Sequence, residues 1–189
     1  MHRTLNLFFI VVTLLLTSQL YSLDLVIDGR IDESEWSDAR EITKYYESLP
    51  YTLDDASGSQ KVLVLEDEKG IYLGFINYQS NETIRMQKHQ RDDEMANADM
   101  VGVSIDFDGD GLLSYGFSIS AGGSILDNVV RNENEVNYDW DSDWGHAVSI
   151  EEGVWYAEMF IPWSVAPMKA QSGNKRKVKL SFYRWLRSE

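Results

Sequence analysis

The stretch 99–120, DMVGVSIDFDGDGLLSYGFSIS, most constrains the fold, because apolar residues alternate with small or polar ones on both sides of a turn-rich loop. The apolar positions are Val101, Val103, Ile105 and Phe107 before the loop, and Tyr115, Phe117 and Ile119 after it. A period of two places these side chains on one face of a β-hairpin turned at residues 108–111. A second sheet must cover that face. The stretch therefore predicts an all-β fold, an antiparallel two-sheet β-sandwich of the jelly-roll type.

Strand-like segments of similar length recur along the chain. They are residues 61–66 and 71–78, 123–131, 146–150 and 154–161, and 178–185. Segments 61–66 and 71–78 are almost continuously apolar, which predicts central strands covered on both faces. In segment 178–185 the alternation directs Leu180 and Phe182 inward. Trp155 and Trp144 are expected in the core.

Two segments between the strands have predicted structural roles. Residues 26–36 combine a short strand, a turn and Trp36, and are expected to form a plug over one end of the sandwich. Residues 80–98 have no clear period, so we expect a long crossover over one end of the sheets. Long ordered loops on a rigid scaffold often carry binding residues.

Residues 1–22 have the layout of a secretory signal peptide: a basic start, an apolar run and a small residue at the end. The apolar run is shorter than the roughly 20 residues that span a bilayer. We therefore expect export to the periplasm, the cell surface or the medium, with residues 23–189 as one domain. The sequence has no cysteine, so disulfides and thiolate metal sites are excluded.

The chain is strongly acidic, with a formal net charge of −14 that becomes −15 once Arg3 is removed with the signal peptide. Such a surface repels phosphate backbones and anionic lipid headgroups. This argues against nucleic-acid partners and against membrane binding by the mature domain. It favours calcium, cationic partners or neutral ligands such as sugars.

Six motifs in order resemble the family 9 carbohydrate-binding modules, and in particular the family-9-like module of bacterial exported and surface proteins. They are IDGRIDESEW from Ile27, RDD from Arg91, ADMVGVSIDFDGDG from Ala98, YGFSISAGG from Tyr115, YDWDSDW from Tyr138 and GVWYAEMFIPW from Gly153. The resemblance covers residues 23–189 and implies a β-sandwich that binds a glycan without catalysing a reaction. It also implies a possible calcium ion and attachment to polysaccharide-processing or surface proteins. A catalytic or outer-membrane domain that often follows is expected to be missing here.

The candidate ligand-binding residues are aromatic side chains with polar neighbours, since sugars stack their C–H faces on rings and bond through their hydroxyls. Tyr138, Asp139 and Trp140 lie together in one loop, and Trp163 follows Pro162 at a strand end. The sequence leaves open whether Trp140 contacts ligand or packs in the core. Arg91 with Asp92 could bracket sugar hydroxyls or form an ion pair that pins a loop.

The candidate metal ligands are Asp106, Asp108 and Asp110, which match the start of a D-x-D-x-D-G calcium loop. The bidentate glutamate of such a loop is missing, because the twelfth position is Phe117. Asp-Gly pairs are also common in hairpin turns. Calcium is therefore possible here but not required by the pattern.

Two other functions are carried as alternatives. A glycoside hydrolase component would use two carboxylates, but 31 acidic residues make suitable pairs uninformative. A haem-binding sandwich could draw axial ligands from the loop that holds Met86, Lys88, His89 and Met95. The hydrolase would release reducing sugar, and the haem protein would show a visible absorption band.

Overall fold

The computed structural model describes residues 23–48, 52, 54–56, 59–93, 95–132, 134–170 and 176–187. The predicted signal peptide lies outside the described residues. The strands are β1 (Arg40–Ile42), β2 (Gln60–Glu66), β3 (Gly70–Tyr78), β4 (Met100–Asp106), β5 (Leu113–Ser120), β6 (Ile125–Arg131), β7 (Glu135–Asn137), β8 (Gly145–Glu151), β9 (Val154–Pro162) and β10 (Lys179–Trp185). Two short 3-10 helices, η1 (Ser34–Asp38) and η2 (Trp163–Val165), complete the described secondary structure. None of the helices in this part of the chain is long and apolar enough to cross a bilayer.

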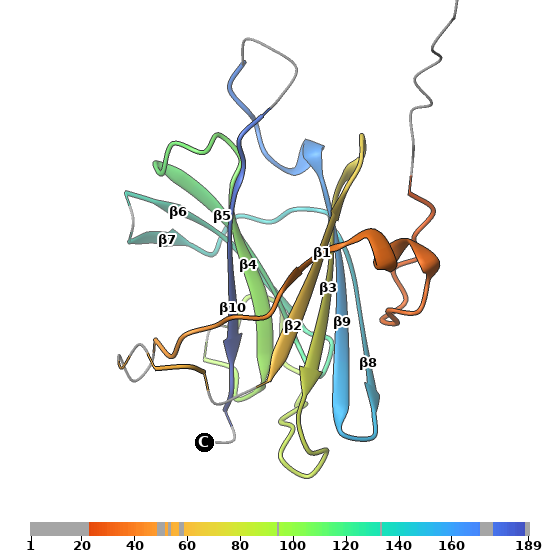
Figure 1. Ribbon diagram of the computed structural model, residues 1–189. Coiled ribbons are helices and arrows are strands. Elements are labelled where there is room, and N and C mark those ends of the chain that lie inside the picture. The colour runs from red at the N-terminus through yellow and green to blue at the C-terminus, as the bar shows by residue number, and fades with distance from the viewer. Residues whose placement is uncertain are drawn as a thin grey trace, which may run out of the picture.

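The strands form two five-stranded antiparallel sheets (Figure 1). The first sheet has the order β1-β2-β3-β9-β8, and the second has the order β10-β4-β5-β6-β7. The predicted hairpin is β4 and β5, in which Val103 pairs with Phe117. The prediction of an antiparallel two-sheet sandwich is confirmed. The short edge strands β1 and β7 have no counterpart in the sequence analysis, because neither shows a pattern of alternation.

The core lies between the inner faces of the two sheets. Phe117 of the second sheet and Trp155 of the first are both 0% exposed. Phe75 and Phe182 meet across the sheets edge to face, with ring centroids 6.2 Å apart. Trp144 is buried as well. The core positions predicted for Trp144 and Trp155 are thus confirmed, and the inward direction of Phe182 follows from its contact with Phe75.

The N-terminal strap, residues 23–39, packs on the outer face of the first sheet (Figure 1). Trp36 is buried there with Leu63 and Tyr72 in a second apolar cluster. Gly74 lets the strap come close, since a Cβ at this position would lie 3.0 Å from Ile31 Cδ1. The anchor role of Trp36 is confirmed, but the expected plug over one end of the sandwich is wrong. The strap covers a sheet face because β2 and β3 are apolar on both sides.

The crossover predicted at residues 80–98 connects β3 in the first sheet to β4 in the second. It is held by Asp99, whose buried carboxylate accepts hydrogen bonds from Gln79 Nε2 at 2.8 Å and from Arg85 N at 3.1 Å. Ile84 within it is buried. The crossover is thus fixed to the sandwich at both its start and its end.

Candidate functional site

The outer face of the second sheet is lined in its central strands by small side chains. Alternation sends Gly102 and Ser104 of β4, and Gly116 and Ser118 of β5, away from the core. On β10 the same face carries Ser181, Tyr183 and Trp185, because Phe182 points inward. Unlike the outer face of the first sheet, this face has no N-terminal strap over it.

Tyr183 lies across Gly102 and is fixed there. A Cβ at Gly102 would be 2.4 Å from a ring carbon of Tyr183, so only glycine allows this contact. The Tyr183 hydroxyl lies 2.7 Å from Ser118 Oγ on the next strand. Burial raises the pKa of Tyr183, and the nearby phenol of Tyr138 adds to this effect against the Ser118 hydrogen bond. The ring therefore remains a neutral phenol held in one position.

Trp185 stands beside Tyr183 on the same face. The two ring centroids are 6.4 Å apart, with an interplanar angle of 44°. All six tryptophans lie in the described part of the chain, and Trp185, at 41%, is the only exposed one. The guanidinium carbon of Arg187 lies 4.9 Å from the Trp185 ring centroid, in a cation–π contact. We call Tyr183 and Trp185 the aromatic platform.

A hollow opens at the other end of this face. It is lined by Asp106, Leu112, Ser114 and Val130, among others. Lys179 at the start of β10 reaches it, with Nζ 3.7 Å from Asp106 Oδ2. The face thus offers polar groups at one end and exposed aromatic surface at the other.

The predicted ligand-binding tryptophans are both partly buried against the core. Trp140 packs on Tyr115 and Phe117, with ring centroids 5.0 and 5.9 Å away. Trp163 lies in η2, where Nε1 donates a hydrogen bond of 2.9 Å to the carbonyl of Asp67. Both rings are partly buried, whereas Trp185 is exposed, so both are poorer stacking surfaces than Trp185. Their role in ligand binding stays a prediction.

The two residues before Trp140 have separate surroundings. Tyr138 is partly buried and lies near Tyr183, as its effect on the pKa of that residue shows. Asp139 is exposed, and its backbone N–H donates a hydrogen bond of 2.9 Å to Asn137 Oδ1. Of the predicted ligand-binding residues, Tyr138 is therefore the one associated with the aromatic platform.

Arg91 and Asp92 belong to an ion-pair cluster, which we call the Arg91 cluster. Arg91 Nη2 donates to both oxygens of the fully buried Asp127, at 2.8 and 2.7 Å. Its Nε lies 2.9 Å from Asp141 and 3.5 Å from Asp92, and Nη2 also donates to the carbonyl of Ser142. These contacts favour the loop-pinning interpretation of Arg91. The sequence analysis missed Asp127, which sits in a strand with no motif around it.

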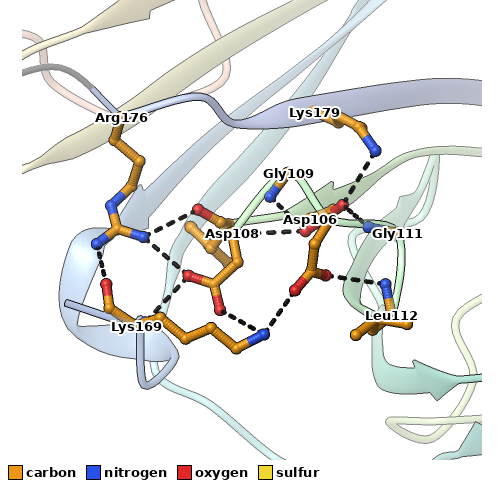
Figure 2. A network of polar contacts seen from close by, with 10 residues as sticks. Asp106, Asp108, Gly109, Gly111, Leu112, Lys169, Arg176 and Lys179 are labelled. Carbon is orange, nitrogen blue, oxygen red and sulfur yellow. Dashed lines mark hydrogen bonds and ion pairs between the residues drawn. The ribbon is translucent and has the colours of Figure 1, made fainter. Parts of the chain in front are cut away.

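The predicted calcium loop is a network of turn hydrogen bonds and ion pairs (Figure 2). The Asp106 carboxylate accepts hydrogen bonds from the backbone N–H groups of Asp108, Gly109 and Gly111, at 2.7 to 3.2 Å. Asp108 Oδ1 accepts from Arg176 Nη1 at 2.9 Å, and Lys169 Nζ contacts both Asp108 and Asp110. The carboxylates of this loop are therefore already paired with backbone N–H groups and basic side chains, an arrangement that does not need a calcium ion. Calcium binding by the protein stays a prediction.

We expect calcium not to raise the thermal unfolding midpoint through this loop, because Lys169 and Arg176 already balance its charge. A cation present at a concentration of 100 times its Kd would stabilise the fold by about 2.7 kcal/mol, which raises the unfolding midpoint by several degrees. Differential scanning calorimetry in calcium and in chelator decides this. A calcium-dependent rise that disappears in Asp108→Asn would place the ion at the loop.

The four residues considered for haem ligation lie in the crossover. Met86, Lys88 and Met95 have exposed side chains, with Met95 84% exposed. His89 Nδ1 lies 2.9 Å from the carbonyl of Gln90. Among the described residues, His89 belongs to no group of histidine and carboxylate side chains close enough to hold a metal ion. His89 Nε2 is buried and has no hydrogen-bond partner among the described residues, and the haem alternative stays a prediction.

The comparisons with solved structures identify the fold. A Bacteroides uniformis protein provisionally described as carbohydrate-binding aligns with a TM-score of 0.60 and 14% identity, over 79% of this chain and 72% of that one. A family 9 carbohydrate-binding module from Caldicellulosiruptor kristjanssonii, in complex with glucose, aligns with a TM-score of 0.54 and 15% identity, over 84% and 72%. This chain has the fold of a family 9 carbohydrate-binding module. The same module was also solved with cellotriose.

The two sequence comparisons gave no match: no family model and no curated protein matches this chain. At 14 to 15% identity, the shared fold agrees with the resemblance drawn from the sequence motifs, and the sandwich that it implied is confirmed. The residues of the aromatic platform could have been found from the alternation in β10. If Leu180 and Phe182 face inward, Tyr183 and Trp185 must face outward.

Proposed function

We propose that this protein is an exported, non-catalytic carbohydrate-binding protein whose sugar site is the aromatic platform. The observation that carries the proposal is the exposed Trp185 beside Tyr183, which is fixed over Gly102. A pyranose ring has an apolar C–H face that packs on such rings, and burying it stabilises the complex. A platform that is rigid before binding loses little conformational entropy.

Polar side chains next to the platform can bind the hydroxyl groups of a sugar. Ser104 and Ser181 pair across β4 and β10 on the same face. Lys179 lies on this face as well, two residues before Ser181 on β10. The small residues of β4 and β5 let the Tyr183 ring lie flat against the sheet. The face can therefore combine stacking at Trp185 with hydrogen bonds along β10.

The titratable groups support binding rather than hydrolysis. A glycosidase needs two carboxylates on either side of the scissile bond. The carboxylate with the most strongly raised pKa, Glu158, is fully buried under the N-terminal strap, on the sheet opposite to the platform. Asp92 also has a raised pKa, mainly through burial, but it belongs to the Arg91 cluster. Neither is placed to act on a sugar at the platform.

The comparisons guide the choice of ligand. The Caldicellulosiruptor module of the same fold was solved with glucose and with cellotriose. We propose that this protein likewise binds a glycan, either as an accessory of polysaccharide processing or as part of a surface protein. Export through the predicted signal peptide would bring it to the periplasm, the cell surface or the medium.

We expect Trp185→Ala to weaken sugar binding at least about tenfold, because it removes the exposed stacking surface. Isothermal titration with glucose, cellobiose and cellotriose measures this on the folded protein. Tyr78→Ala is the matched control, since Tyr78 is 51% exposed on β3 of the other sheet. Binding that survives in Trp185→Ala but is lost in Trp140→Phe would move the site to the predicted loop at 138–144. No saturable binding to any sugar tested would sink the proposal.

A further inference from the structure

Two arginines, Arg85 and Arg187, lie close together in the chain segments beside the platform. The buried carboxylate of Asp99 accepts a hydrogen bond from Arg85 N at 3.1 Å through Oδ2 and from Arg187 N at 2.7 Å through Oδ1. One side chain therefore fixes the backbone of both arginines. Asp99 precedes Met100, which pairs with Trp185 in the sheet, so this point adjoins the exposed tryptophan.

These two cations are not neutralised within the part of the chain that the structure describes. The other basic clusters are paired: Arg91 with Asp127, and Lys169 and Arg176 with Asp108. Neither Arg85 nor Arg187 takes part in any of the ion pairs found among the described residues. A chain with a net charge of −14 has many acidic residues to spare for such pairing. Other described basic residues, such as Lys88 and Arg131, are also absent from these ion pairs. What sets Arg85 and Arg187 apart is that one buried carboxylate holds the backbone of both beside the platform.

The guanidinium of Arg187 is also short of hydrogen-bond acceptors. Its Nε is buried and has no partner among the described residues. The side chain is held instead by the cation–π contact over the Trp185 ring. A planar guanidinium with free donors matches the geometry of a carboxylate or sulfate.

The position of Arg187 discriminates between ligands by charge. A neutral sugar that stacks on the covered part of the Trp185 ring must displace the guanidinium and offers it only uncharged hydroxyl oxygens in return. A sugar with an anionic substituent displaces it and offers two oxygen acceptors at the same time. Charge-assisted hydrogen bonds are the stronger kind, particularly where the partner was unsatisfied before.

We infer that the aromatic platform prefers an anionic saccharide, one that carries a carboxylate or sulfate group bound by Arg187 with Arg85 close by. This inference rests on the proposed function, because it assigns the class of sugar to the same site. A uronic acid and a sulfated sugar share the chemistry that the guanidinium recognises. They differ in source, so both are used as probes.

The test compares sugars that share the glucose ring and differ at C6, where two of them carry a negative charge. Glucuronic acid and glucose 6-sulfate are titrated against glucose on the full mature protein. We expect either anionic sugar to bind at least roughly tenfold more tightly than glucose. In Arg187→Gln the ratio should fall to about one, while Trp185→Ala should weaken all three sugars. Arg131→Gln is the matched control, since it removes the same charge at the far end of β6 and should leave the ratio unchanged.

The outcomes separate the two proposals. If glucose binds as tightly as both anionic sugars, or if the preference survives in Arg187→Gln, the inference is overturned while sugar binding at Trp185 stands. If only one anionic probe is preferred, that probe names the group that is recognised. If none of the three sugars binds, the inference fails, and the proposed function fails with it if cellobiose and cellotriose do not bind either.

Discussion

Replacement of Arg91 by methionine is expected to destabilise the protein by about 3 kcal/mol, because it leaves a buried carboxylate without its cation. Asp127 is 0% exposed, and both of its oxygens accept hydrogen bonds from Arg91 Nη2. Among the hydrogen bonds of the described residues, only the one from the backbone N–H of Ser142, at 2.9 Å, would remain to the Asp127 carboxylate. Methionine keeps most of the side-chain volume, so the effect reports on charge rather than on packing. Urea unfolding near neutral pH measures it.

A second ion pair of Arg91, with an exposed carboxylate, provides the control. Asp141 also pairs with Arg91, at 2.9 Å, but its side chain is 65% exposed. Asp141→Asn should therefore cost less than about 1 kcal/mol. The double variant Arg91→Met, Asp127→Asn should recover part of the loss, because it removes the unpaired charge. If Arg91→Met lowers the free energy of unfolding by less than about 1 kcal/mol, the buried charge of Asp127 does not need Arg91 for its stabilisation.

The second large effect concerns Glu158, whose replacement by glutamine should flatten the dependence of stability on pH. Burial raises the pKa of Glu158 from its ordinary 4.5 to about 7. Hydrogen bonds from the backbone N–H groups of Gly29 and Asp28 oppose this, and the charges of Glu33 and Asp28 reinforce it. Because the folded-state pKa is raised, the protonated form stabilises the fold. This contribution is complete below pH 4.5 and is lost as the pH rises through 7.

Between pH 5 and pH 8 the wild-type protein should thus lose about 2 to 3 kcal/mol of stability that Glu158→Gln retains. Denaturant unfolding across this range gives the difference between the two curves. Glu152→Gln, in the exposed turn between β8 and β9, removes one carboxylate without burial and is the control. Parallel curves for wild type and Glu158→Gln would show that Glu158 ionises in the folded state as it does in the unfolded chain.

Much of the fold could be predicted because alternation is a local property. The hairpin at 99–120 shows its inner face in the sequence, since every second residue is apolar, and β4 and β5 follow it closely. The continuous apolar character of β2 and β3 correctly predicted cover on both faces. What covers the outer face could not be predicted in the same way. Tertiary packing alone connects the strap to that face. The sequence analysis therefore expected the strap over one end of the sandwich, which is wrong.

The candidate site was harder to predict than the fold. Residue type pointed to Trp140 and Trp163, but whether an aromatic ring is exposed depends on neighbours that are distant in the chain. Trp140 is partly covered by its contact with Tyr115 and Phe117 of β5. Trp185 is exposed because only Tyr183 and Arg187 lie near its ring among the described aromatic and cation–π contacts. Similarly, Arg91 was recognised as a functional candidate, but its partner Asp127 was not.

The sequence alone determined the class of fold, the inner face of each long strand and the resemblance to a carbohydrate-binding family, because each depends on residues close together in the chain. The tertiary structure decided which rings face solvent, which carboxylates are buried and which arginines lack an acidic partner. Tyr183 meets Gly102 from a strand some 80 residues away, and Glu158 is buried by a turn 129 residues before it. Burial and pairing are properties of the assembled sandwich. The binding properties of its outer face therefore depend on contacts that no local pattern contains.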